Sequence, residues 1–137
     1  MQTFLPYSDF DKCAKCLDMR RLGKQRVESW QILGLLSGKY PKSTWNNHPA
    51  VLMWKGFEPA LNMYGRAICS EWISRGYVDN MIGRFDIHES YDLPAFIGNE
   101  KFHASHRSAL LFKKYDYYIK FGWTEPAEYN YVWPTKI

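Results

Sequence analysis

The sequence predicts a single all-α domain spanning residues 1–137, with about four to five helices and extended N- and C-terminal segments. A chain of 137 residues can bury one hydrophobic core, and its 46% hydrophobic residues argue against disorder. Apolar side chains recur at three- and four-residue intervals along several segments, which is the periodicity of a helix face. Because no segment alternates polar and apolar residues for long enough to form a sheet, we expect negligible strand content.

The first half of the domain should be built around a central helix at residues 18–37. Residues 1–7 are apolar and include a proline, so we expect an extended segment that packs against the body. Ser8 or Asp9 can cap a short helix that follows, and Asp18 can cap the central helix.

Turn and capping signals predict the next helices. Asn47 or His48 can cap a helix whose first turn contains Pro49, and a longer helix should run from Pro59 to about Arg75. This longer helix has the apolar periodicity of a scaffold element.

The last third of the chain is predicted to hold one more helix. Residues 77–98 mix acids, glycine, proline and isolated aromatics without a period, so we expect irregular structure. Asn99 can then cap a helix that runs to about Lys113. The tail at 125–137 should be extended and packed through its aromatic side chains.

The net charge of +4 is modest, but the charges are unevenly distributed. Residues 12–42 hold eight Lys and Arg against two acids, and residues 101–120 hold five against one. The intervening residues 79–100 hold five acids and one arginine. Two basic segments separated by an acidic one favour a protein with one phosphate-facing side, so we expect a polyanion, and DNA in particular, as the partner.

The three cysteines predict no disulfide framework. Cys13 and Cys16 form a CxxC, but no second CxxC follows and no βαβ pattern surrounds it, so we expect a reduced, partly buried pair. The odd cysteine number and the lack of a secretory leader predict a cytoplasmic protein. No run of about twenty apolar residues is present, so we expect no membrane association. We also expect a monomer.

The central helix concentrates the candidate functional residues. Asp18, Arg21, Gln25 and Glu28 recur at helical spacing and share a face, which further cations flank: Arg20, Lys24 and Arg26. Arginine offers a planar fork suited to phosphate, and a carboxylate among fixed cations stays ionised. The alternative is a solvated helix with local ion pairs of a few tenths of a kcal/mol each.

Other candidate DNA contacts come from helix starts and basic stretches. A helix N-terminus has positive potential and free N–H groups, and His, Arg and Lys side chains can donate to phosphates. The His pair at i and i+3 permits a metal site, but no acidic or Cys ligand is close in sequence, so we expect neither metal nor cofactor. The expected contacts are Asn47, His48, His103, His106, Arg107, Lys113 and Lys114.

Several short segments resemble the pyrimidine-dimer DNA glycosylase family, small all-helical enzymes typified by a phage endonuclease that incises ultraviolet-damaged DNA. The likeness is carried by Leu22-Gly-Lys-Gln-Arg26, by Asn47-His-Pro49 with Met53-Trp-Lys-Gly56, by Arg75-Gly-Tyr77 and more faintly by residues 113–123. The chain is also similar to a group of short bacterial and phage proteins related to that family. They share Arg20-Arg-Leu-Gly-Lys-Gln-Arg26 and His103-Ala-Ser-His-Arg-Ser108.

The resemblance implies a DNA repair glycosylase with AP-lyase activity on damaged or modified pyrimidines. In this chemistry the N-terminal α-amine attacks the deoxyribose C1′, a Schiff base forms and β-elimination cuts the strand. Gln2 disfavours removal of the first methionine, so the amine belongs to Met1. α-Amines have a reference pKa of about 8, so a useful fraction is neutral at cellular pH, and a carboxylate is needed for proton transfers. The expected catalytic residues are Met1, Arg21, Arg26 and Glu28.

Two assignments and two other functions stay open. The family glutamate directly follows the arginine that Arg26 matches, whereas Glu28 lies one residue later, about 100° further around a helix. Asp18 is therefore an alternative carboxylate, and Lys24 an alternative amine. The other functions are a non-catalytic nucleic-acid-binding protein and an enzyme of nucleotide or modified-base metabolism.

Overall fold

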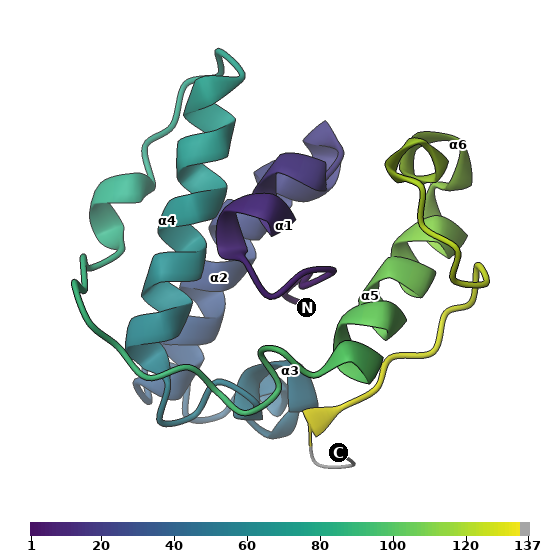
Figure 1. Ribbon diagram of the computed structural model, residues 1–137. Coiled ribbons are helices and arrows are strands. Elements are labelled where there is room, and N and C mark those ends of the chain that lie inside the picture. The colour runs from purple at the N-terminus through teal and green to yellow at the C-terminus, as the bar shows by residue number, and fades with distance from the viewer. Residues whose placement is uncertain (135–137) are drawn as a thin grey trace.

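A computed structural model describes residues 1–134 and contains six α-helices and no strand within that range (Figure 1). The helices are α1 (Phe10–Cys16), α2 (Met19–Leu36), α3 (Pro49–Leu52), α4 (Glu58–Ser74), α5 (Glu100–Lys113) and α6 (Tyr115–Tyr118). Three 3-10 turns accompany them: η1 (Thr44–Asn47), η2 (Ile82–Arg84) and η3 (Ile119–Phe121). The all-α prediction is confirmed, although α3 and α6 are single turns and α6 was not expected. The last part of the expected extended tail, 135–137, lies outside the described residues.

Four of the six described α-helices begin where the sequence provides a capping side chain. Asp9 starts α1, Asp18 starts α2 and Asn99 starts α5, each accepting a hydrogen bond from a backbone N–H three residues later. His48 starts α3 through Nδ1, which accepts the N–H of residue 50 at 3.0 Å. Prolines lie in the first turns of α3 and α4, as expected. The helix starts are therefore encoded locally.

Helix α4 packs against both α1 and α2 and forms the centre of the core. Gly23 allows a close approach on α2, because a Cβ there would lie 3.1 Å from the ring of Trp72. On the same helix, Val27 is 43% exposed, whereas Gln25 is fully buried. The two residues lie about 200° apart around the helix, so burial of one exposes the other.

The N-terminal segment, residues 2–7, runs extended through the middle of the fold between α2 and α5 (Figure 1). Its backbone is bonded by side chains rather than by a neighbouring strand. Gln25 Nε2 donates to the carbonyl of Gln2 at 2.7 Å, and the Tyr64 hydroxyl lies 3.0 Å from the N–H and 3.1 Å from the carbonyl of Phe4. These bonds satisfy buried backbone N–H and C=O groups of a segment that pairs with no neighbouring strand.

Helix α5 holds the same segment from the other side. The N–H of Leu5 donates to His106 Nδ1 at 3.0 Å, and the carbonyl of Leu5 lies 2.7 Å from His103 Nδ1. Because His103 Nε2 accepts the N–H of Gly98 at 2.8 Å, the neutral ring carries its proton on Nδ1 and donates it to Leu5. Arg107 Nη1 donates to the carbonyl of Pro6 at 2.7 Å. We call His103, His106 and Arg107 the N-terminal clamp.

The buried clamp histidines predict that the fold loses stability in acid. Burial lowers the pKa of His106 to about 3, and burial also lowers the pKa of His103. In the unfolded chain histidine titrates near 6.5, so between about pH 6.5 and 3 the unfolded state binds more protons. The stabilisation is complete above pH 6.5 and is lost as the pH falls toward 3. Urea denaturation at a series of pH values should therefore show a falling free energy of unfolding below pH 6.5.

A substitution isolates the contribution of His106. His106→Asn keeps an acceptor for the Leu5 N–H but removes the titration, so its free energy of unfolding should fall less steeply between pH 6.5 and 4. His88→Asn, in the irregular segment outside the clamp, should follow the wild-type slope. Equal slopes for wild type and His106→Asn would contradict this account.

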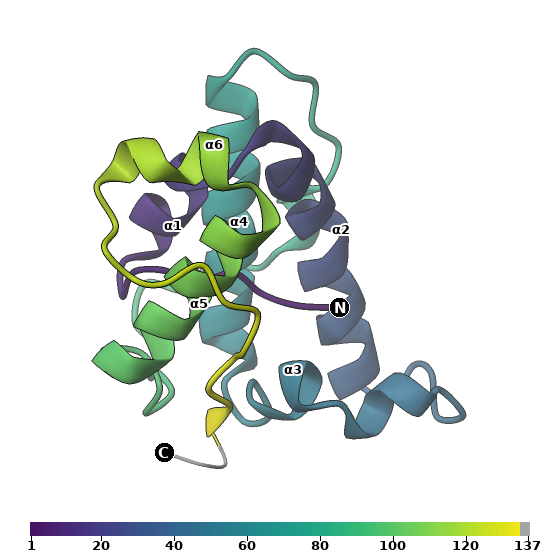
Figure 2. The ribbon, with the colours of Figure 1, turned by 90° about the vertical axis from the view of Figure 1, so that its right-hand side faces the viewer.

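The C-terminal tail after α6 returns along α5 (Figure 2). The Ser105 hydroxyl accepts the N–H of Val132 at 3.0 Å, and the Ser108 hydroxyl accepts the N–H of Glu128 at 3.2 Å. The helix thus fixes the tail backbone at two points, which places the tail side chains beside the N-terminal segment.

The three cysteines, Cys13, Cys16 and Cys69, are free, as expected for a reduced CxxC pair. All three are buried rather than partly buried. Burial raises the pKa of Cys16 and of Cys69 to about 12, so both remain thiols at neutral pH. Within residues 1–134, none of the helices has the length and apolar character needed to cross a membrane.

Candidate active site

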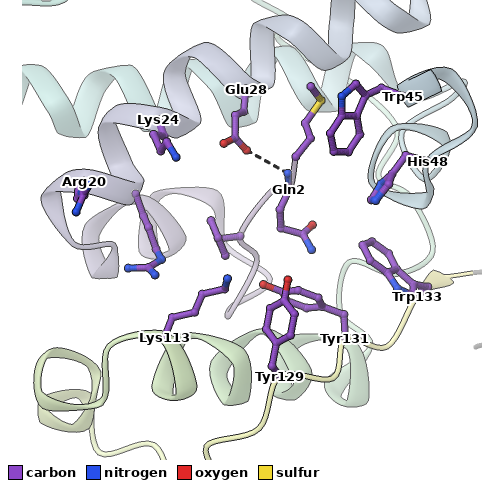
Figure 3. Close-up of a pocket in the computed structure, with 13 residues that line it drawn as sticks. Gln2, Arg20, Lys24, Glu28, Trp45, His48, Lys113, Tyr129, Tyr131 and Trp133 are labelled. Carbon is purple, nitrogen blue, oxygen red and sulfur yellow. Dashed lines mark hydrogen bonds between the residues drawn. The ribbon is translucent and has the colours of Figure 1, made fainter. Parts of the chain in front are cut away.

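The N-terminus lies in a cavity of about 560 Å³ between α2 on one side and α5 with the tail on the other (Figure 3). This volume lies within the usual range for pockets that bind small molecules or single groups of a larger ligand. The lining residues come from both ends of the chain and are Met1, Gln2, Phe4, Arg20, Arg21, Lys24, Glu28, Trp45, His48, Lys113, Tyr129, Tyr131 and Trp133.

The carboxylate of Glu28 is bound to the start of the chain. Its Oε2 accepts the backbone N–H of Gln2 at 3.1 Å and lies 3.4 Å from Nε2 of Gln25. Figure 3 shows Glu28 pointing from α2 into the cavity, beside Gln2. The carboxylate therefore lies one peptide unit away from the N-terminal amine of Met1.

Four cations surround the same cavity. Arg20, Arg21 and Lys24 project from the first two turns of α2, and Lys113 projects from the last turn of α5. Arg21 forms an ion pair with Asp18 at 3.2 Å. In the part of the chain that the structure describes, the other three form no ion pair with a carboxylate. The cavity thus has uncompensated positive charge that attracts phosphate groups.

Lys113 supplies a second amine to the cavity. Burial lowers the pKa of Lys113, and the charge of Arg21 lowers it further, while Glu28 acts in the opposite direction. Its Nζ lies 4.5 Å from the centre of the Tyr129 ring, and this cation–π contact favours the charged ammonium form of Lys113. Lys113 must therefore be compared with Met1 as a source of a nucleophilic nitrogen.

Five rings form a continuous surface on the cavity, which we call the aromatic wall. Its members, in spatial order, are Trp45, His48, Trp133, Tyr131 and Tyr129. Centres of adjacent rings lie between 4.9 and 5.8 Å apart. Figure 3 shows Tyr129, Tyr131 and Trp133 across the cavity from α2, and Trp45 and His48 at one end of the cavity.

His48 belongs to the aromatic wall and lies in the same cavity as the N-terminal amine of Met1. Burial lowers the pKa of His48, and the positive charge of the N-terminal amine lowers it further. Since its Nδ1 accepts a backbone N–H, the neutral ring carries its proton on Nε2. The imidazole is thus a neutral donor in the same cavity as the amine.

A family model described as pyrimidine dimer DNA glycosylase matches residues 1–83 of the 137-residue chain. The chain belongs to the pyrimidine dimer DNA glycosylase family. The match includes Met1, Glu28 and the cations of α2, and it gives DNA as the substrate and DNA repair as the setting. Comparison with curated proteins and with solved structures found no match.

The structure brings together many of the residues expected at the site of this glycosylase. Seven of them line the cavity: Met1, Arg20, Arg21, Lys24, Glu28, His48 and Lys113. Of the two carboxylates left open by the sequence, Glu28 lines the cavity and Asp18 does not. Asp18 is 2% exposed; burial alone would raise its pKa, but hydrogen bonds from Tyr118 and Arg21 hold that pKa below its usual value. Asp18 therefore has a structural role.

Arg26 was expected among the catalytic residues, and the structure places it elsewhere. Its Nη1 forms an ion pair with Asp79 at 2.6 Å, and its guanidinium carbon lies 4.6 Å from the centre of the Trp72 ring. Arg26 lies about 200° around α2 from Glu28, on the side that faces α4 and the segment after it. It stabilises that junction and cannot reach the cavity.

Four more expected DNA contacts are structural. Gln25 and the two clamp histidines, His103 and His106, are buried and bond the N-terminal segment. Arg107 forms an ion pair with Glu125 at 2.8 Å and a second with a glutamate of its own helix. Burial alone would lower the pKa of Arg107, but these carboxylates raise it, so its charge is already neutralised within the protein.

The remaining two expected contacts, Asn47 and Lys114, lie outside the cavity lining. Asn47 is exposed at the end of η1, and Lys114 Nζ lies 5.5 Å from the centre of the Tyr117 ring. Neither side chain therefore lines the cavity that contains the Met1 amine and Glu28.

Six lining residues of the glycosylase were not expected from the sequence: Gln2, Phe4, Trp45, Tyr129, Tyr131 and Trp133. The three tail aromatics alternate with other residues, which is the period of an extended segment with one face on the protein. That alternation was an available signal. These tail residues also lie beyond the range that the family model matches.

Proposed function

We propose that this glycosylase is also an AP lyase and that the Met1 α-amine is its nucleophile. The nitrogen lone pair attacks C1′ of a damaged or modified pyrimidine nucleotide, the bond from C1′ to the base breaks, and the base leaves with a proton. A Schiff base then links Met1 to the sugar. Removal of a proton from C2′ breaks the C3′–O bond by β-elimination, and water releases Met1.

The contact between Glu28 and the Gln2 N–H, at 3.1 Å, is the observation that carries this proposal. A general acid–base group must lie within reach of the reacting centre, and this bond fixes the carboxylate next to the amine. The sugar bound to Met1 would lie beside Glu28, which can move the protons at C1′ and C2′. In this scheme Glu28 supplies acid–base catalysis and Met1 supplies the covalent link.

The cations that line the cavity support the same catalytic proposal. Arg20, Lys24 and Lys113 provide positive charge for the phosphates on either side of the attacked nucleotide. Arg21 is held in place by Asp18, so its planar group is oriented before DNA arrives.

Borohydride trapping tests the proposal directly. An oligonucleotide with one abasic site is incubated with the protein, the Schiff base is reduced, and the trapped protein is digested and analysed by mass spectrometry. The adduct should lie on the N-terminal peptide at Met1, and Lys113→Met should still be trapped. An adduct on Lys113 or Lys24 would replace Met1 as nucleophile, and the lack of any adduct would leave a DNA-binding protein without lyase chemistry.

A further inference from the structure

We propose that Gln25 is a positioning residue of this enzyme: its amide, oriented by the Tyr64 hydroxyl, holds one oxygen of Glu28 and leaves the other free to move protons at the sugar. The inference rests on the proposed function, since it concerns the carboxylate that serves there as acid and base. Gln25 is fully buried, so it acts through Glu28 and does not touch DNA.

The hydrogen-bonding groups of the Gln25 amide are all occupied. Its Nε2 donates to the carbonyl of Gln2 at 2.7 Å and, with its second proton, to Oε2 of Glu28 at the longer distance of 3.4 Å. Its Oε1 accepts the Tyr64 hydroxyl at 2.6 Å and the N–H of Phe4 at 3.3 Å. A rotated amide would turn its oxygen toward a carbonyl and a carboxylate, which are both acceptors. Only one orientation of the amide is therefore bonded.

Tyr64 reaches this amide from α4, the helix at the centre of the core. The side chain is fully buried, and burial raises the pKa of Tyr64 well above its usual value, so the hydroxyl keeps its proton and can donate. It shares that proton between Gln25 Oε1 at 2.6 Å and the carbonyl of Phe4 at 3.1 Å, and the shorter contact is the stronger one. The hydroxyl thus fixes the oxygen end of the amide and leaves the nitrogen end for Glu28.

The two oxygens of the Glu28 carboxylate have different surroundings. Oε2 accepts the N–H of Gln2 at 3.1 Å as well as Nε2 of Gln25. Within residues 1–134, Oε1 accepts no hydrogen bond from the protein. Because Oε2 is held from two directions, Oε1 also keeps a defined position at the cavity that Glu28 lines. A displacement of about 1 Å can slow a reaction by about 10²-fold, so this restraint matters for proton transfer.

A double-mutant cycle tests whether Tyr64 acts through the Glu28 carboxylate. Tyr64→Phe removes only the hydroxyl that orients the amide, so β-elimination of an abasic oligonucleotide in single turnover should slow by about tenfold. DNA affinity should not change, because the cations of the cavity are retained. In a Glu28→Gln background the same change should slow elimination by less than about twofold, because the group that the hydroxyl helps to hold is already absent.

Thr3→Val is the matched control for loosening of the N-terminal segment. Thr3 is fully buried, and its hydroxyl accepts Nε1 of Trp54 at 3.2 Å. In the described part of the chain that hydroxyl forms no hydrogen bond with Gln25 or Glu28. Like Tyr64→Phe, the change removes one buried hydroxyl, so both variants should unfold at lower temperature by circular dichroism. Thr3→Val should nevertheless catalyse β-elimination at the wild-type rate.

Gln25→Glu gives a pH profile that a merely structural role would not produce. The new side chain can donate to Glu28 only when the pair holds a proton, because two carboxylates at this distance do not readily ionise together. The elimination rate relative to wild type should therefore rise by about tenfold as the pH is lowered from about 9 to about 6. The other groups that face the pair are unchanged, so their titration cancels in this ratio: the Met1 amine, the four cations of α2 and α5, His48, the tail tyrosines and Tyr64.

Three results would overturn the inference. These are equal slowing by Tyr64→Phe with and without the Glu28 carboxylate, Thr3→Val as slow as Tyr64→Phe, and a ratio for Gln25→Glu that does not change with pH. If Gln25→Glu does not fold, the cycle and its control decide alone. No elimination by wild type, or elimination by Glu28→Gln at the wild-type rate, would remove the proposed function and this inference together. Slow elimination by Glu28→Gln with Tyr64→Phe at the wild-type rate would remove this inference alone.

Discussion

Glu28→Gln is expected to slow strand cleavage by about 10²- to 10⁴-fold while DNA binding is retained, because this is the usual contribution of a positioned acid–base group. Glutamine is similar in size, and its amide oxygen can still accept the Gln2 N–H that Glu28 accepts at 3.1 Å. The N-terminal segment should therefore keep its place. The lost function is proton transfer at the sugar, not the architecture of the cavity.

The measurement is single-turnover cleavage of abasic and ultraviolet-irradiated DNA, with binding followed in parallel. Glu89→Gln makes the same change in net charge at an exposed position in the irregular segment, so it controls for electrostatic effects. Its cleavage rate should equal that of wild type. Cleavage by Glu28→Gln at the wild-type rate would exclude Glu28 as the proton-transfer group.

Extension of the N-terminus is expected to abolish Schiff-base trapping and strand cleavage. Adding residues before Met1 converts its amine into an amide, whose nitrogen lone pair is delocalised into the carbonyl and is no longer nucleophilic. The new terminal amine is carried away from Glu28. DNA binding should remain within a few-fold of wild type, because the cations of α2 and α5 are unchanged.

Restoration of the original terminus provides the matched control. If the extension ends in a protease site whose cleavage leaves Met1 as the first residue, digestion should restore both trapping and cleavage. An extended protein that traps and cuts as fast as wild type would point to an internal amine in the cavity, Lys113 or Lys24.

Local signals in the sequence were sufficient for most of the fold. Caps such as Asp18 and Asn99 act on backbone groups three residues away, so the positions of α2 and α5 could be predicted from short windows. The shared face of Arg21 and Glu28 follows from helical spacing in the same way, and both line the cavity.

Long-range pairing could not be read from such windows. The partner of Arg26 is Asp79, and the partner of His106 is the backbone of Leu5, so neither role is visible from neighbouring residues. A basic or histidine-rich helix face looks the same whether it meets DNA or its own chain. Gln25, His103, His106 and Arg107 bond the extended N-terminal segment, so these four expected DNA contacts have structural roles instead.

The threaded N-terminal segment also sets when the enzyme can become active during its own synthesis. Leu5 bonds to His106, 101 residues later in the chain, and closing so long a loop is slow compared with forming the local helices. The N-terminal segment is therefore among the last parts of the described fold to be fixed. A nascent chain, or a fragment that ends before α5, carries a free amine with no clamp to hold it at Glu28. If Met1 is the nucleophile, as proposed, such incomplete chains should not nick DNA, and cutting would require a chain that includes α5.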